Sequence, residues 1–312
     1  MVFSGRAVTI PGESLRIDQV GLPEEIAWNL FGPTVIRELG SEREVHKRTK
    51  KATEKLDEVM AQSWVVAWRT PTIEVTTLLS FHPVRASGPA IRLHPLVCGW
   101  MNADFDGDQI AVFLLLTAAA QQEAAEKLSV IGHLRRDPSL IATLLPMQDS
   151  LWGLAELSRK KEGLQRIRSI VGINVAMPEG FVTREVLTES LRQILEQEGE
   201  EKAVEVVQQL MRLGFDAAKQ SGASVNVFAG RSLSAPEQPD PLTEDSYLRY
   251  LQEVEDEISS RIDYDSDDIG PQLLAVKSGA RGTVSQLITG LRFRAIRDIH
   301  GQLVFIPRVP IG

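Results

Sequence analysis

Short runs of β-branched and aromatic residues recur over the first hundred positions, each bounded by glycine or proline. Runs of this kind predict short strands. The four runs are residues 6–10, 64–68, 73–81 and 90–96. Apolar residues also flank the polar stretch at 102–109, and they predict strands on both sides of it.

Two helical segments are predicted within this strand-rich region. Residues 23–39 begin with Pro-Glu-Glu and carry apolar side chains on one face, and Pro33 is expected to interrupt the helix. A second helix is predicted from Ser41 to about Ala61, because Ser41 and Glu44 have the spacing of a capping box. Its narrow apolar stripe indicates a surface position.

Beyond residue 116 the pattern changes to apolar residues at every third or fourth position, which predicts helices. The predicted helices are residues 117–128, 149–161 and 184–211, with glycines 172, 180 and 214 near their breaks. A linker is predicted at 229–241, where proline, serine and glycine dominate and no periodicity remains.

The composition is that of a soluble globular protein: 312 residues, 43% hydrophobic and 24% charged. The single cysteine, Cys98, excludes an internal disulfide and is expected to be a buried small apolar residue in a reducing compartment. The N-terminus lacks signal-peptide features, and the longest apolar run, residues 110–120, is too short to span a bilayer. We therefore expect a cytoplasmic location and no membrane partner.

The net charge of −8 is unevenly distributed. Residues 240–268 hold eleven acidic residues and two arginines, whereas residues 277–308 hold six basic residues and one aspartate. Solvated surface is the simpler interpretation of both segments. The basic segment is equally consistent with contacts to phosphate groups.

The stretch NADFDGDQ, residues 102–109, places Asp104, Asp106 and Asp108 at every second position. On a strand, successive carboxylates would share one face about 6.6 Å apart, whereas a turn at Gly107 would bring them closer. Two carboxylates about 4 Å apart repel by roughly 4 kcal/mol at an effective dielectric of about 20, so a cation is expected. Oxygen ligands without nearby histidine or cysteine favour Mg2+ or Ca2+ over zinc.

A calcium loop of the EF-hand type is excluded by its own spacing rules. It needs glycine at the sixth position and glutamate at the twelfth, where this chain has Gln109 and Leu115. A solvated acidic turn is the other alternative, but the apolar flanks at 98–101 and 110–116 indicate a loop held by a rigid scaffold. Mg2+ completes its shell with water and substrate phosphate, which indicates phosphoryl or nucleotidyl transfer.

The wider stretch IRLHPLVCGWMNADFDGDQIAVF, residues 91–113, closely resembles the catalytic segment of the largest (β′) subunit of bacterial multisubunit DNA-directed RNA polymerases. Further stretches match in the family's order: FSGRAV (3–8), QVGLPEEIAWNLFGP (19–33), RTPT (69–72), PMQDSLWGL (146–154), LGFDAAKQSGASV (213–225) and KSGARGTVSQL (277–287). The resemblance covers nearly the whole chain.

The resemblance implies an α+β fold with three parts. Residues 1–116 would form a double-psi β-barrel with helical inserts that carries the metal loop. Residues 117–228 would form a helical pore domain, and residues 229–312 a shortened funnel-like segment with a basic C-terminal part.

The resemblance also implies roles for individual residues. Asp104, Asp106 and Asp108 match the aspartates that hold the catalytic Mg2+ at the growing RNA 3′ end, where a second Mg2+ arrives with the nucleotide. Three further positions match substrate contacts: Arg69 and Asn102 at the sugar of the incoming ribonucleotide, and Arg281 facing its triphosphate. Arg6 matches a position near the nucleic-acid backbone. For each arginine, an ordinary surface or ion-pairing role is the alternative.

The chain departs from the family pattern at several positions near the metal loop. The family usually has Asn-Arg-Ala-Pro-Thr followed by Leu-His, where this chain has Trp68 to Glu74, and Phe113 replaces a usual histidine. The family's clamp, zinc cysteines, bridge helix and trigger loop have no counterparts in this sequence.

We therefore expect activity only in an assembly with the missing flanks, the β-type second-largest subunit and the remaining polymerase subunits. Template DNA, the RNA 3′ end and ribonucleoside triphosphates are the expected partners. The alternative is a truncated or diverged non-catalytic paralogue that binds polymerase subunits or nucleic acid. A different two-barrel polymerase is disfavoured by HPLVC, QDSLWGL and SGARG.

Overall fold

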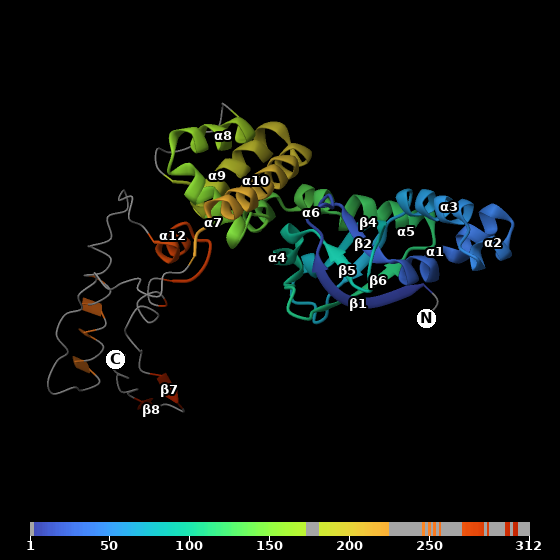
Figure 1. The fold of residues 1–312 in the computed structure, drawn as a ribbon, viewed down its shortest axis with the longest axis horizontal. Coiled ribbons are helices and arrows are strands. Elements are labelled where there is room, and N and C mark those ends of the chain that lie inside the picture. The colour runs from blue at the N-terminus through green and yellow to red at the C-terminus, as the bar shows by residue number, and fades with distance from the viewer. Residues whose placement is uncertain are drawn as a thin grey trace. The chain divides into compact units, whose positions relative to one another are not determined.

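The computed structural model describes residues 3–172, 181–224 and 270–283. It also describes a few positions beyond them: 245–246, 249–250, 252–253, 256, 286, 297–299 and 302–304. The chain divides into two compact units (Figure 1). Unit 1 is Met1–Pro146 with Thr188–Gln209, and unit 2 is Met147–Leu187 with Leu210–Gly312.

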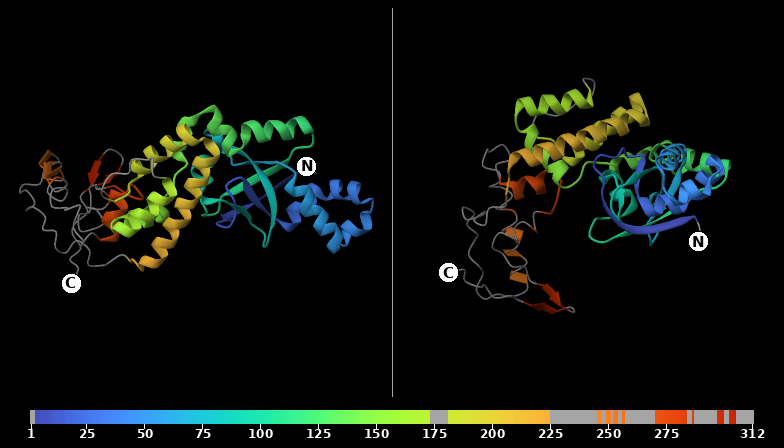
Figure 2. Two further views of the ribbon diagram at one scale, coloured as in Figure 1. Left: turned by 90° about the horizontal axis from the view of Figure 1, so that it is seen from above. Right: turned by 45° about the vertical axis from the view of Figure 1, so that its right-hand side comes forward.

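Six strands of unit 1 close into a barrel in the order β1-β5-β2-β4-β3-β6 (Figures 1 and 2). Their bounds are β1 (Ser4–Pro11), β2 (Gln19–Pro23), β3 (Val65–Trp68), β4 (Leu78–Ala86), β5 (Ile91–Leu93) and β6 (Gln109–Leu114). The pairs β1/β5 and β2/β4 are parallel and the other four are antiparallel. The α+β class and the barrel predicted from the sequence are confirmed.

The barrel interior is filled by branched and aromatic side chains from alternate strand positions. Leu22, Leu79, Phe81, Ile91 and Leu93 are all fully buried. Because these side chains come from strands far apart in sequence, they join the strands into one apolar core. Runs of β-branched and aromatic residues explain why the sequence predicted β1, β3, β4 and β5.

Helix α1 (Glu24–Leu39) runs through Pro33 without a break, so the predicted interruption is wrong. Proline removes one backbone donor and usually kinks a helix. Here the helix buries Trp28, Leu30, Phe31 and Val35, and this packing outweighs the lost hydrogen bond. The helix ends at Gly40, whose left-handed backbone (φ 67°) lets its N–H reach the Ile36 carbonyl.

The helix predicted from Ser41 to about Ala61 is two helices, α2 (Glu42–His46) and α3 (Lys50–Ala61). Ser41 caps the first as expected, accepting the Glu44 N–H at 3.4 Å. Thr49 caps the second by accepting the Ala52 N–H at 3.3 Å. A threonine that can cap competes with continuation of the helix. Helices α1 to α3 gather at one end of the barrel (blue in Figures 1 and 2).

The segment before the metal loop is helical, so the strand predicted there is wrong. Strand β5 ends at Leu93, and a 3-10 turn, η2 (Pro95–Val97), leads into α4 (Cys98–Met101). His94 explains the change, because its Nδ1 accepts the Leu96 N–H at 3.2 Å while proline occupies the first helical position.

Two other strand predictions need correction. The run at 73–81 becomes a strand only at Leu78, because Val75–Thr77 forms the 3-10 turn η1 with Glu74 as its cap. Strand β2 was missed, because Pro23 reads in the sequence as the start of a helix rather than the end of a strand.

After β6, helical structure continues as predicted. Helix α5 (Ala118–Glu123), capped by Thr117, continues into a π-helical turn, η3 (Ala124–Leu128). It is followed by α6 (Val130–Arg136) and the 3-10 segment η4 (Pro138–Thr143).

Unit 2 contains α7 (Asp149–Ser158), α8 (Lys161–Val171) and α12 (Pro271–Lys277). Helices α9 (Arg184–Glu198) and α10 (Glu200–Ser221) each have residues in both units. A two-stranded ribbon joins β7 (Arg297–Ile299) to β8 (Gln302–Val304). No helix in the described part of the chain is both long and apolar enough to cross a membrane.

The glycines of the helical region have different roles from those predicted. Gly172 ends α8 as expected, but Gly214 lies inside α10, and the break in the predicted helix 184–211 is at Gly199. Gly214 is there for packing, because a Cβ atom on it would overlap the Ser150 carbonyl of α7. Gly180 and the predicted linker at 229–241 lie outside the described residues.

Candidate metal centre

The three aspartates lie on a turn between α4 and β6. Helix α4 ends at Asn102 in the left-handed conformation (φ 47°, ψ 42°), and the Ala103 N–H donates to the Cys98 carbonyl at 2.9 Å. Gly107, at φ 129°, then turns the chain into β6, and a side chain would strain that backbone. Of the two alternatives left open by the sequence, the turn at Gly107 is the one observed, and the strand is wrong.

Strand β1 anchors the backbone of this loop through Thr9, which is only 1% exposed. The Thr9 N–H donates to the Asp108 carbonyl at 2.9 Å. Its Oγ1 lies 3.1 Å from the same oxygen and 3.5 Å from the Asp104 carbonyl. Thr9 therefore fixes both ends of the aspartate turn against the barrel wall.

The three carboxylates converge. One carboxylate oxygen from each of Asp104, Asp106 and Asp108 lies within 4.8 Å of the others. Asp104 and Asp106 are exposed and Asp108 is half-buried. A hydrogen bond to Asp106, with loss of solvation and the charges of Asp106 and Asp108, raises the pKa of Asp104 above its usual value. The part of this pKa shift that comes from the charges of Asp106 and Asp108 is repulsion that a bound cation would relieve.

Arg69, the residue after β3, forms a two-pronged ion pair with Asp108. Its Nε donates to Oδ2 at 2.7 Å and its Nη2 donates to Oδ1 at 3.2 Å. The hydrogen bond to Arg69 is the largest cause that lowers the pKa of Asp108 below its usual value. Arg69 thus favours the ionised form of Asp108, whereas the pKa of Asp104 is shifted in the opposite direction.

The loop that carries Arg69 is tied to α4. The Arg69 N–H donates to the Thr77 carbonyl at 3.4 Å, and the buried Thr76 hydroxyl donates to the Trp100 carbonyl at 2.8 Å. Neither Thr9 nor Thr76 is predictable from the sequence as a site residue, because a threonine on a strand or turn carries no local signal of a contact this distant in sequence.

Within unit 1, the structure brings some predicted site residues to the aspartate loop and not others. Asn102 is exposed at the end of α4, two residues before Asp104. Arg6 is exposed on β1, and strand alternation directs it to the opposite face from Thr9. Arg281 is exposed just after α12 in unit 2, where its N–H donates to the Ala275 carbonyl at 3.0 Å. The metal loop therefore gathers the aspartates, Asn102 and Arg69.

The residues that depart from the polymerase pattern have structural partners. Trp68 donates its indole N–H to the Thr72 hydroxyl at 2.7 Å, and its ring centroid lies 6.4 Å from that of Phe113. Glu74 caps η1 together with Thr77, whose hydroxyl accepts the Glu74 N–H at 3.2 Å. Each departure is thus accommodated by a local contact.

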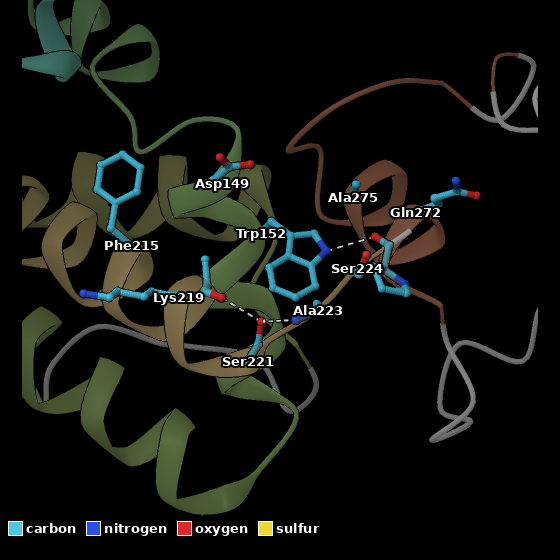
Figure 3. A pocket seen from close by; sticks show the side chains of 11 residues that line it. Asp149, Trp152, Phe215, Lys219, Ser221, Ala223, Ser224, Gln272 and Ala275 are labelled. Atoms are coloured by element: carbon cyan, nitrogen blue, oxygen red, sulfur yellow. Dashed lines mark hydrogen bonds between the residues drawn. The ribbon is translucent and has the colours of Figure 1, made fainter. Parts of the chain in front are cut away.

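A cavity of about 560 Å³ lies within unit 2, lined by residues of α7, α10 and α12 (Figure 3). The Trp152 indole N–H donates to the Pro271 carbonyl across it at 2.9 Å. Its charged lining residues are Asp149 and Lys219, and the Lys219 side chain points away from Trp152 in Figure 3. Two separated charges do not form a reactive cluster like that of the aspartate loop.

Cys98 is expected to resist alkylation in the folded protein. Burial, followed by the charges of Asp104 and Asp108, raises the pKa of its thiol to about 12. At pH 8 the smaller thiolate fraction should slow reaction with iodoacetamide on the order of a thousandfold relative to the urea-unfolded chain. Mass spectrometry of timed samples measures both rates, and equal rates would contradict the buried position.

A family model described as "RNA polymerase Rpb1, domain 2" matches residues 40–130. The matched segment includes Arg69, Asn102 and the three aspartates, whereas Arg6 and Arg281 lie outside it. The match therefore coincides with the segment that forms the metal loop and four of the six barrel strands.

Half of the chain is similar to curated subunits named DNA-directed RNA polymerase subunit beta′. It is 36% identical over 173 residues to that of Aliarcobacter butzleri (strain RM4018), covering 52% of this chain and 11% of the relative. It is 39% identical over 171 residues to that of Caldicellulosiruptor saccharolyticus, covering 52% of this chain and 15% of the relative. The chain thus spans less than one sixth of the length of these relatives.

Proposed function

About half of the chain is homologous to the β′ subunits of bacterial DNA-directed RNA polymerases, and from this premise we propose that it is the catalytic-core portion of such an enzyme. The proposed activity is Mg2+-dependent transfer of ribonucleotides to the RNA 3′ end. The observation that carries the proposal is the convergence of three aspartate carboxylates in the segment that the family model matches.

The donor set of the loop fits Mg2+. All three candidate ligands are carboxylates, and the described residues place no histidine or cysteine among them. Mg2+ prefers hard oxygen ligands and keeps several waters. Exposure of Asp104 and Asp106 leaves room for those waters and for substrate phosphate.

The proposed roles follow from what each residue already contacts. When bound, Mg2+ would lower the pKa of the RNA 3′-hydroxyl and stabilise charge on the attacked α-phosphate. Asp104, Asp106 and Asp108 hold the ion, and Thr9 fixes the turn that presents them. Arg69 orients Asp108 through Nε and Nη2, and its Nη1 is proposed to contact the ribonucleotide sugar.

The remaining roles rest on the resemblance. Asn102, exposed beside Asp104, is proposed to contact the sugar, where the 2′-hydroxyl distinguishes RNA from DNA precursors. Arg281 is proposed to face the triphosphate and Arg6 the nucleic-acid backbone. A second Mg2+ would arrive with the nucleotide.

The proposed setting is a cytoplasmic assembly. The partners would be a β-type second-largest subunit, the remaining polymerase subunits, template DNA, the RNA 3′ end and ribonucleoside triphosphates. Because the matches span only 11% to 15% of the relatives, activity is proposed for the assembly rather than for this polypeptide by itself.

A non-catalytic paralogue is the second candidate function. Trp68, Glu74 and Phe113 depart from the polymerase pattern, and each makes a contact within the barrel unit: a hydrogen bond, a helix cap or an aromatic contact. Such a protein would keep the barrel and bind polymerase subunits or nucleic acid without making RNA. The intact aspartate loop favours the catalytic role instead.

Reconstitution tests the proposal. The chain is combined with a β-type subunit and the remaining β′ segments, and extension of a labelled RNA primer on template DNA is followed at increasing Mg2+. Extension that requires both the chain and Mg2+ is the expected result. Copurification of the chain with the β-type subunit, without any extension, would select the non-catalytic function.

A further inference from the structure

We propose that Arg69 makes the aspartate loop selective for Mg2+ over Ca2+ by restricting Asp108 to ligation through a single oxygen. In this role Arg69 is a positioning residue that acts through Asp108. The inference rests on the proposed function, because it concerns the metal ion that the loop would hold.

The hydrogen bonds of Asp108 are unevenly divided between its two oxygens. Oδ2 accepts from Arg69 Nε at 2.7 Å and from the Asp104 N–H at 3.1 Å, whereas Oδ1 accepts from Arg69 Nη2 at 3.2 Å. A carboxylate offers about four acceptor positions, two on each oxygen. The bonds from Arg69 and the Asp104 N–H therefore use both positions of Oδ2, whereas Oδ1 accepts one bond from Arg69.

Asp108 cannot easily turn to offer both oxygens. Rotation of its carboxylate would break the paired hydrogen bonds to the guanidinium and the bond from the Asp104 N–H. Charge-assisted paired bonds of this kind are strong and geometrically specific. The side chains of Arg69 and Asp108 are only 17% and 20% exposed, so water does not readily replace these bonds.

Single-oxygen ligation favours the smaller ion. Mg2+ requires near-octahedral geometry and keeps several waters, so one oxygen from each carboxylate suits it. Ca2+ takes six to eight oxygens and readily uses both oxygens of a carboxylate. Freeing Asp108 should therefore help Ca2+ more than Mg2+.

The ratio of the two affinities separates this effect from simple electrostatics. Loss of the Arg69 charge alters the attraction for both divalent ions alike, because the ions carry the same charge. The Mg2+ to Ca2+ ratio therefore reports ligand geometry. A role for Arg69 in folding alone would leave the ratio unchanged in folded protein.

The experiment uses the whole chain and three variants. Arg69→Gln removes both the charge and the paired hydrogen bonds to Asp108. Arg69→Lys keeps the charge but cannot form the paired hydrogen bonds. Arg85→Gln is the matched control, because Arg85 forms the same pair of hydrogen bonds to Asp57, away from the aspartate loop. Its Nε donates to Oδ1 at 2.5 Å and its Nη2 donates to Oδ2 at 2.8 Å. Bound Mn2+ is measured by electron paramagnetic resonance and displaced with Mg2+ or Ca2+.

Wild type and Arg85→Gln should bind Mg2+ more tightly than Ca2+. In both Arg69 variants the ratio of Mg2+ affinity to Ca2+ affinity should fall on the order of tenfold, the usual scale for residues that orient a ligand. Circular dichroism identifies folded samples, and Arg69→Lys provides the answer if Arg69→Gln does not fold. A folded Arg69 variant with the wild-type ratio overturns the proposal alone. Wild type that binds none of these ions contradicts the metal site and the proposed function with it.

Discussion

Replacing Asp106 with asparagine is expected to abolish Mg2+-dependent RNA synthesis by the reconstituted enzyme. Asparagine keeps the size of the side chain and removes one of the three converging negative charges. A metal ion supplies several kcal/mol of transition-state stabilisation, so losing it should slow primer extension roughly a thousandfold or more. Single-turnover extension at a fixed Mg2+ concentration measures the effect.

The matched control is Glu54→Gln. Glu54 is an exposed carboxylate on α3, paired only with Lys50 at 3.8 Å among its described neighbours, and exposed pairs of this kind contribute little. Its loss should leave extension at the wild-type rate. If Asp106→Asn also extends RNA at the wild-type rate, the aspartate loop is not the catalytic metal site.

Gly153→Ala should strongly destabilise unit 2. A Cβ atom at Gly153 of α7 would overlap the carbonyl oxygen of Gly214 in α10 and lie 2.8 Å from the Ala218 nitrogen. Both obstacles are backbone atoms, so the helices must separate. Overpacking of this kind costs about 1–3 kcal/mol and occasionally more, and we expect the upper end. Urea unfolding followed by circular dichroism gives the free energy of unfolding.

Gly32→Ala in α1 is the matched control. A Cβ atom there meets nothing within 4 Å, and the position is inside a helix. Alanine should therefore leave stability unchanged or raise it by up to about 1 kcal/mol. A Gly153→Ala protein as stable as wild type would mean that α7 and α10 do not approach as closely as described.

Features with a local sequence signal were predictable. The barrel strands other than β2 were predicted from β-branched runs and apolar flanks, and a turn at Gly107 was one of two alternatives for the aspartates. Two prolines led to wrong predictions. Helix α1 continues through Pro33 because its side chains are buried. A helical turn begins at Pro95, in a predicted strand, because His94 caps it.

Contacts distant in sequence were not predictable. Thr9 and Asp108 are 99 positions apart, and Arg69 and Asp108 are 39 apart. The resemblance directed attention to Arg69 but assigned it to the ribonucleotide sugar, and its ion pair with Asp108 emerged only from the folded barrel. The role of Gly214 was also not predictable, because its close approach to Ser150 depends on how two helices pack.

The anchor of the aspartate turn on β1 has a consequence for the order of folding. The pair β1/β6 joins the first strand of the barrel to the last, and Thr9, the next residue of β1, bonds to the Asp108 carbonyl just before β6. Contacts between such distant segments form slowly, because a long loop must first close. The metal loop can take its final shape only after the sixth strand has been synthesised and has met the first. Cation binding would therefore serve as a late marker of barrel closure.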